Sequence, residues 1–318
     1  MSAATKIGRR TIRIANGFVD IVVLTAILLL IVFSGYAIWD AGQVHSAASS
    51  RRYEMYNPTV ENETASFEDL QALNPDVFAW LTVYGTNIDY PVVQGQDNRR
   101  YVNTDARGRH SLSGAIFLDA RNGANFSDFS SIVYGHHMEN QVMFGEIASF
   151  SDRSYFEARR HGMLFFSGRE HGLEFFAFVH ADAYDTSVFR TAITEPEDKQ
   201  AYLDLLMQMA MHTREDVQVT INDRIVLLST CSPNSTNGRD ILIGKITDAP
   251  HSNPFIVETI RTPQAIPGID ELQGIWEQLD ILAQVSIVIF IVLLILLAII
   301  LIFIKCRRSS KARREKKG

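Results

Sequence analysis

Two long uncharged runs constrain this chain more than any other feature, because each is long enough to cross a lipid bilayer. Residues 21–39 contain no charged side chain, and residues 281–304 are interrupted only by Gln284 and Ser286. As helices they would be roughly 28 and 36 Å long, against a hydrocarbon core of about 30 Å. The sequence therefore predicts two transmembrane helices. A cleaved signal peptide is the alternative for the first run, but the apolar region of such a peptide is shorter.

Basic residues flank both runs on the side away from the middle of the chain. Four precede the first run before any acidic residue, and eight follow the second run against Glu315 alone. By the positive-inside rule, segments 1–20 and 305–318 are cytoplasmic and the middle is exported. The segment 41–280 keeps 18 of the 30 Lys and Arg residues and 33 of the 36 Asp and Glu residues, a net charge of about −15. This charge argues against a nucleic-acid partner, and the basic tail is expected to meet anionic lipid.

The exported region divides into a folded domain and two connecting segments. Residues 40–65 are polar and are expected to form a stalk, and residues 249–280 contain four prolines and are expected to form a linker. Nine short β-like runs lie between them, at 78–83, 88–94, 115–119, 131–134, 163–167, 173–180, 217–221, 224–230 and 240–246. Such a series favours a mainly β domain over residues 66–248, built as a closed barrel or a sandwich.

Three segments of this domain have helical patterns. Residues 66–73 begin with a Ser–Asp capping box, and residues 145–160 are expected to form a helix in two pieces. The clearest pattern covers residues 195–212, where Thr194 would cap the helix and Glu197 would complete a capping box. Its apolar stripe predicts packing against the sheet, through Leu203, Leu206, Met207 and Ala210.

Cys231 is the only cysteine of the exported region, because Cys306 lies at the cytoplasmic end of the second run. It ends the apolar strand IVLLSTC and precedes the turn-rich segment 232–238. A side chain at the end of a strand, beside a loop, is exposed and firmly held, which suits a nucleophile. A buried inert thiol is the alternative, and these residues alone do not choose between the two.

Arg239 follows the short turn and directly precedes the next apolar run, which begins at Asp240. If the two strands are antiparallel neighbours, its guanidinium lies close to Cys231. There it would stabilise a thiolate and donate hydrogen bonds to a developing oxyanion. A surface arginine paired with Asp240 or another acid is the alternative.

A third strand, at 131–134, ends at Gly135 and is followed by His136 and His137. Because side chains alternate along a strand, one histidine of this pair can face a cleft while the other faces away. A reactive thiol needs a proton-transfer partner, and histidine gains and loses a proton near neutral pH. Either histidine can instead be an ordinary hydrogen-bonded surface residue.

These residues, together with longer segments around them, resemble the sortases, and among them class B. The segments are NPD at 74–76, FAWL at 78–81, TNIDYPVVQ at 86–94, GAIFLD at 114–119, YGHHM at 134–138, MFGE at 143–146 and LSTC at 228–231. They occur in the family's order over residues 67–247, nearly the whole exported domain. The resemblance implies a closed β-barrel of about eight strands with peripheral helices, and an extra helix between two late strands that residues 195–212 would form.

The resemblance also implies that His136, Cys231 and Arg239 are the catalytic residues of a cysteine transpeptidase. Cys231 would attack a backbone carbonyl in the C-terminal sorting signal of an exported protein, and Arg239 would hold the oxyanion. His136 would protonate the leaving amine. An amine of a cell-wall precursor or of a pilin lysine would then resolve the thioacyl-enzyme. Three more residues would line the peptide groove: Asn98, Ser229 and Thr230. The chemistry implies no metal and no organic cofactor.

The sequence departs from the family's pattern in two places. His137 stands where many relatives have asparagine, which leaves open which histidine acts. A second membrane run after the domain is more usual among the pilin-assembling class C sortases, so wall anchoring and pilus assembly both stay open. The expected location is a bacterial cell membrane, with the domain outside. The expected partners are exported surface proteins or pilins, the amine acceptor and the lipid bilayer.

Three other readings of the same residues predict different behaviour. A membrane-anchored cysteine peptidase would use the same cysteine and histidine but release its product to water. A metal site would recruit His136, His137 and Cys231, although no regularly spaced ligand motif supports it. A non-catalytic adhesion module would not need Cys231 at all.

Overall fold

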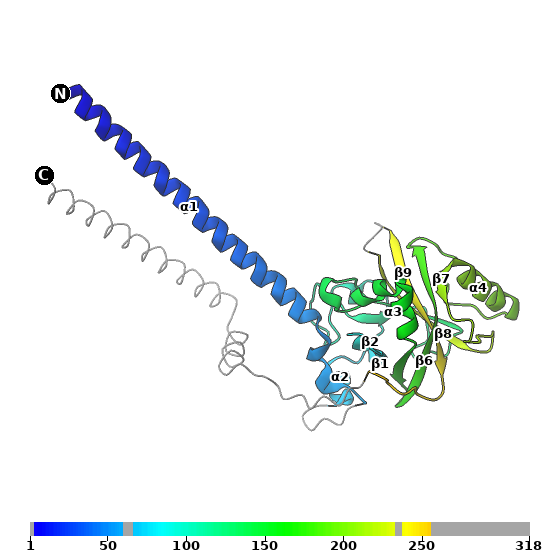
Figure 1. The fold of residues 1–318 in the computed structure, drawn as a ribbon. Coiled ribbons are helices and arrows are strands. Elements are labelled where there is room, and N and C mark those ends of the chain that lie inside the picture. The colour runs from blue at the N-terminus through cyan, green and yellow to red at the C-terminus, as the bar shows by residue number, and fades with distance from the viewer. Residues whose placement is uncertain (1–2, 60–65, 233–236, 256–318) are drawn as a thin grey trace. The chain divides into compact units, whose positions relative to one another are not determined.

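The computed structural model describes residues 3–59, 66–232 and 237–255, and Figure 1 draws them as a ribbon. The predicted second membrane run at 281–304, the tail at 305–318 and most of the segment 249–280 lie outside the described residues. The chain divides into two units, and the larger of them spans Ile38–Val257.

Helix α1 (Ala3–Ala48) contains the first predicted membrane run. Within it, Gly17–Ala37 has a mean hydropathy of 2.6, and none of that stretch is buried in protein. It is the one helix among the described residues that is long and apolar enough to cross a membrane. Its length and composition therefore make it a candidate membrane span at the predicted place.

The larger unit is built on a single sheet whose ends meet. Its strands are β1 (Val77–Val83), β2 (Asp89–Val93), β3 (Ile116–Leu118), β4 (Ser130–Tyr134), β5 (His161–Phe166), β6 (Arg169–Asp182), β7 (Ala210–Thr213), β8 (Arg224–Cys231) and β9 (Gly238–Thr247). They are ordered β5-β1-β2-β3-β4-β8-β9-β6-β7, and β5 also pairs with β6. That last pairing closes a barrel of eight strands and leaves β7 at its side. The predicted mainly β barrel is confirmed.

The continuous apolar run of β8 follows from its place at the centre of this sheet. Val226 and Leu228 point into the barrel core, whereas Ile225 and Leu227 enter a second core on the outer face. Helix α4 (Pro196–Met209) covers that outer face (Figure 1), and its buried residues belong to the second core. A strand covered on both faces needs apolar residues at consecutive positions. The predicted packing of this helix against the sheet is confirmed for Leu203 and Leu206, whereas Met207 is exposed and Ala210 lies in β7.

The shorter helices lie where the sequence places them. Helix α2 (Phe67–Leu73) begins with a complete capping box between Ser66 and Asp69. The segment 145–160 does form two pieces, a 3-10 helix η5 (Gly145–Ser151) and helix α3 (Arg153–Ala158). The first piece is tighter than an α-helix, and α3 starts afresh at Asp152, whose carboxylate caps it by accepting from the Tyr155 amide.

Two expectations for the second half of the domain are wrong. The helix expected over residues 195–212 has Glu195 at its N-cap with no side-chain cap, and it ends at Met209. The next residues form β7 because the edge of β6 offers backbone partners that local propensity does not reveal. The strand expected at 217–221 is a loop, in which Thr220 and Asp223 hydrogen-bond to each other and the Asp223 carboxylate pairs with Lys245 of β9.

The polar segment after α1 packs against the barrel. Two short 3-10 helices, η1 (Ser50–Arg52) and η2 (Glu54–Tyr56), follow the end of α1. Ala48 and Tyr53 are buried in the barrel core. Residues 48–57 are thus part of the folded domain.

Candidate active site

Cys231 and Arg239 lie opposite each other on neighbouring strands. Cys231 is the exposed last residue of β8, and the antiparallel register pairs it with Arg239 near the start of β9. The turn between them is closed by the Ser232 amide, which donates to the Gly238 carbonyl at 2.8 Å. Residues opposed in this way have β-carbons about 4.5–5.5 Å apart. The predicted antiparallel pairing of these two strands is confirmed.

His136 reaches the same place from a third strand. β4 runs parallel to β8, with Tyr134 paired to Ser229, and the Gly135 amide donates to the Ser229 carbonyl at 3.2 Å. His136 and Cys231 each follow two residues after that pair. Because adjacent strands lie about 4.8 Å apart, the structure brings the three predicted catalytic residues to one end of three adjacent strands.

The two histidines have different surroundings. His136 is half-buried, and its Nε2 lies 2.8 Å from the Val102 carbonyl. A carbonyl only accepts, so Nε2 carries the proton and Nδ1 is left for other partners. His137 pairs through its backbone with Met143, and its Nδ1 is buried without a partner among the described residues. Within the same residues, no group of three His, Cys, Asp or Glu side chains converges as a metal site would require.

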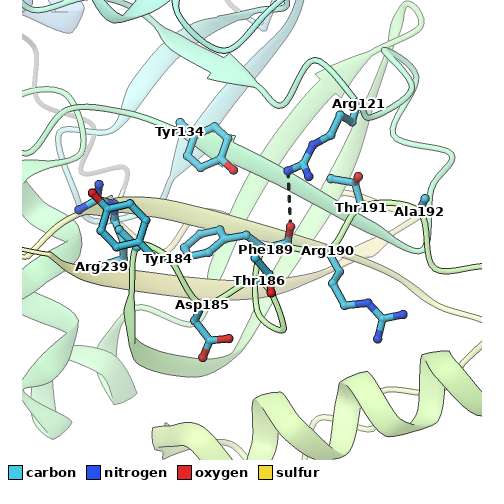
Figure 2. A pocket seen from close by; sticks show the side chains of 11 residues that line it. Arg121, Tyr134, Tyr184, Asp185, Thr186, Phe189, Arg190, Thr191, Ala192 and Arg239 are labelled. Carbon is cyan, nitrogen blue, oxygen red and sulfur yellow. Dashed lines mark hydrogen bonds between the residues drawn. The ribbon is translucent and has the colours of Figure 1, made fainter.

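A cavity of about 850 Å³ opens beside Arg239, and Figure 2 shows its lining. One wall is formed by Arg121, Tyr134 and Arg239. The other wall is the loop between β6 and α4, which contributes residues from Ala183 to Ala192. The aromatic ring of Tyr184 on this loop is largely exposed. The cavity therefore joins an arginine of the candidate site to a long loop with polar and aromatic side chains.

A buried carboxylate fixes one corner of this cavity. Asp119 has no exposed surface, and it accepts two side-chain hydrogen bonds from Arg121, at 2.9 and 2.7 Å, and one from the Tyr134 hydroxyl at 3.0 Å. Arg121 also donates to the Phe189 carbonyl at 3.4 Å, and the Tyr134 ring stacks on the Phe189 ring (Figure 2). Asp119, Arg121 and Tyr134 thus form a brace, hereafter the Asp119 brace, for the cavity loop.

The electrostatics of this brace keep each group in one protonation state. Burial alone would raise the pKa of Asp119, but the hydrogen bonds from Arg121 and Tyr134 outweigh it and hold that pKa below its usual value. Burial and the neighbouring Asp119 charge both raise the pKa of Tyr134. At neutral pH the carboxylate is therefore charged and the phenol is protonated, so the hydrogen bond between them persists.

The predicted groove residues have different positions. Asn98 donates to Asp119 at 3.0 Å and accepts from the Ala120 amide at 2.7 Å, so both ends of its amide hold the turn that carries the brace. The Ser229 and Thr230 hydroxyls are buried and have no partner among the described residues. Ser229 shares the face of β8 on which Cys231 lies, and Thr230 points to the opposite face.

Sequence reasoning did not find the Asp119 brace or the cavity loop. Asp119 was visible as the last residue of the GAIFLD segment, and an Asp followed two residues later by Arg was the available signal. The contact of Arg121 with Phe189 joins parts of the chain that are far apart, and no local pattern marks it.

Comparison with known proteins places this architecture in a family, although no family model matches the chain. A sortase B from Listeria monocytogenes is 33% identical over 180 residues, which cover 56% of this chain and 72% of that protein. A sortase B from Staphylococcus aureus is 29% identical over 243 residues, covering 72% and 96%. The crystal structure of sortase B from the Type II pilus of Streptococcus pneumoniae is 48% identical with a TM-score of 0.51, covering 58% of this chain and all of that one.

The closed barrel and these similarities together define a sortase-type cysteine transpeptidase. Within that class, the chain belongs to the sortase B family. The resemblance that the motifs between residues 67 and 247 indicated is thereby confirmed.

Proposed function

We propose that the protein is a membrane-anchored sortase that cleaves the C-terminal sorting signal of exported proteins and joins the new carboxyl end to an amine. The observation that carries the proposal is the cross-strand pair of Cys231 and Arg239, with His136 at the same end of the neighbouring strand. The cavity beside Arg239 provides room for a peptide next to this set.

The proposed reaction has two halves. The thiolate of Cys231 attacks the scissile carbonyl carbon, and Arg239 donates to the oxyanion that forms. The C–N bond then breaks, and a doubly protonated His136 gives the proton on its Nδ1 to the departing amine, while its Nε2 proton stays hydrogen-bonded to the Val102 carbonyl. A thioacyl-enzyme remains. An incoming amine attacks the thioester carbon and loses a proton to the histidine. The new amide leaves and Cys231 is regenerated.

The peptide would lie between the cavity loop and the face of β8 that carries Cys231. The hydroxyl of Ser229 supports this placement, because it is buried on that face without a partner in the described part of the chain, and a bound peptide would supply one. Thr230 lies on the other face of β8, so its place in the groove stays a prediction. Asn98 would act on the groove through the turn of Asp119.

Membrane anchoring would give the enzyme access to both of its substrates. The apolar stretch Gly17–Ala37 supports an anchor, and the predicted second run at 281–304 would add another. Confinement to the outer face of the membrane raises the effective concentration of a membrane-linked substrate or acceptor. One relative is a sortase B from a pilus, which supports a pilin lysine as acceptor beside a cell-wall precursor.

The product formed with and without an added amine tests the transferase proposal. We expect the full-length protein, incubated with an exported protein that carries a sorting signal and with a peptide amine, to give an amide of the acyl part and that amine. Mass spectrometry of the products measures this. A carboxylic acid as the only product, whatever amine is present, would instead favour the peptidase. Separate arms with a cell-wall precursor and with a pilin distinguish the two acceptors.

Arg121→Gln tests whether the Asp119 brace serves substrate binding. Without the arginine the cavity loop loses its tether at Phe189, so we expect KM for the sorting peptide to rise about tenfold with kcat changed less than about twofold. Arg109→Gln is the matched control. Arg109 is 56% exposed and pairs with the buried Asp105, much as Arg121 is 57% exposed and pairs with Asp119, but Arg109 does not line the cavity. Equal KM changes in both variants would contradict the assignment.

A further inference from the structure

The loop that follows His136 is held in a conformation that it would not adopt alone. It turns back on the histidine, and the Phe144 amide donates to the His136 carbonyl at 3.0 Å. Three of its residues have positive φ without being glycine: Asn140 at 57°, Gln141 at 62° and Met143 at 52°. Such angles cost free energy and persist only where surrounding contacts enforce them. Something outside the loop must therefore hold it.

The hydroxyl of Tyr90 is one such contact. Tyr90 lies on β2 and is only 2% exposed. Its hydroxyl accepts from the Met143 amide at 2.9 Å and donates to the Ala48 carbonyl at 2.9 Å. The directions are fixed, because an amide can only donate and a carbonyl can only accept. One buried oxygen thus ties the strained loop to the last residue of α1.

The segment 48–57 is in turn fastened to the barrel. The Tyr53 ring meets the Tyr90 ring edge-on, with centroids 6.5 Å apart. The guanidinium of Arg107 donates to the Arg52 carbonyl at 2.6 Å and lies over the rings of Tyr53 and Tyr56, at 5.6 and 5.4 Å. Arg107 therefore clamps this segment in the place where the Ala48 carbonyl meets Tyr90.

We propose that Tyr90 is a positioning residue for His136, and that segment 48–57 supports the active site by holding Tyr90 in place. The segment fixes the Tyr90 hydroxyl, the hydroxyl fixes Met143, and the loop from Met143 to Phe144 fixes the backbone of the histidine. The inference rests on the proposed role of His136 as the proton donor to the leaving amine.

The test compares two leaving groups. A departing amine needs a proton from His136, whereas a departing aryl thiolate does not. The full-length Tyr90→Phe protein is compared with the wild type on two substrates that share the acyl part of a sorting peptide. One ends in the natural amide and the other in an aryl thioester, whose thiolate leaves unprotonated. We expect kcat on the amide to fall about 10- to 100-fold and the first-turnover burst of thiol released from the thioester to keep a rate within about twofold of the wild type. A general loss of structure would lower both rates equally, and that result would overturn the inference.

Two further variants sharpen this test. Tyr84→Phe is the matched control, since Tyr84 is also buried and donates to a backbone carbonyl, that of His251 at 3.2 Å, beyond the end of β9 remote from Arg239. It should change neither rate. Arg107→Gln loosens the segment without altering Tyr90, and it should reproduce the selective loss on the amide to a smaller degree.

The outcomes separate this inference from the proposed function. If the wild type cleaves the amide and Tyr90→Phe cleaves it equally fast, the positioning role is wrong and the proposed function stands. If the wild type forms no thioacyl-enzyme with any sorting peptide, the proposed function itself fails.

Discussion

Replacing Cys231 with alanine will abolish cleavage and transfer while leaving the barrel folded. Cys231 is exposed at the end of β8, so the loss of its sulfur opens no cavity and costs little stability. No other thiol lies among the described residues, and a water molecule cannot form the thioacyl-enzyme. We expect the rate to fall by at least about 10⁴-fold, as for removal of other covalent nucleophiles.

Two measurements check this expectation. Intact-protein mass spectrometry should show the acyl adduct on the wild type and none on Cys231→Ala. In cells, surface proteins should keep uncleaved sorting signals in the Cys231→Ala strain. Cys306→Ala is the matched control and should process its substrates normally. Identical processed C-termini in the Cys231→Ala and wild-type strains would contradict the proposed role and favour the adhesion module.

His136→Gln will cause the second large loss, and its comparison with His137→Asn decides which histidine acts. His136 and Cys231 each lie two residues after the Tyr134–Ser229 pair of β4 and β8. His137 instead pairs through its backbone with Met143, and its Nδ1 is buried. Loss of a general acid lowers rates by about 10²–10⁴-fold, and we expect a fall in that range for His136→Gln on an amide substrate. We expect His137→Asn to stay within about threefold of the wild type.

The aryl thioester separates proton donation from other effects of the His136 substitution. Acylation of His136→Gln by the thioester should remain close to that of the wild type, because the departing thiolate needs no proton. The readout is the burst of thiol released in the first turnover. A large loss in His137→Asn together with full activity in His136→Gln would reverse the assignment of the two histidines.

The parts of the fold that the sequence predicts are those whose signals are local. The apolar runs of β8 and β9 are separated by a short turn, which favours their pairing as antiparallel neighbours. The meeting of Cys231 and Arg239 could therefore be argued from spacing alone. Likewise, the capping box at Ser66 depends only on residues three apart and is present as predicted.

The parts that the sequence does not predict depend on partners that are distant along the chain. The position of His136 beside Cys231 depends on the parallel pairing of β4 with β8, and only the family resemblance anticipated it. Helix α4 ends at Met209 because β6 has a free edge there. Tyr90 lies within a segment that the family resemblance singles out, but its two hydrogen-bond partners come from the loop after His136 and from the end of α1.

The strand order has a consequence for when this enzyme becomes chemically competent during its synthesis. β8 and β9 are the last barrel strands to be made, yet they occupy the middle of the sheet, between β4 and β6. A chain that emerges from its N-terminus must leave that gap open until this late hairpin arrives. The hairpin carries Cys231 and Arg239 together, so the thiol gains its neighbours only as the barrel closes. A chain that ends before this hairpin therefore lacks both the proposed nucleophile and the proposed oxyanion donor.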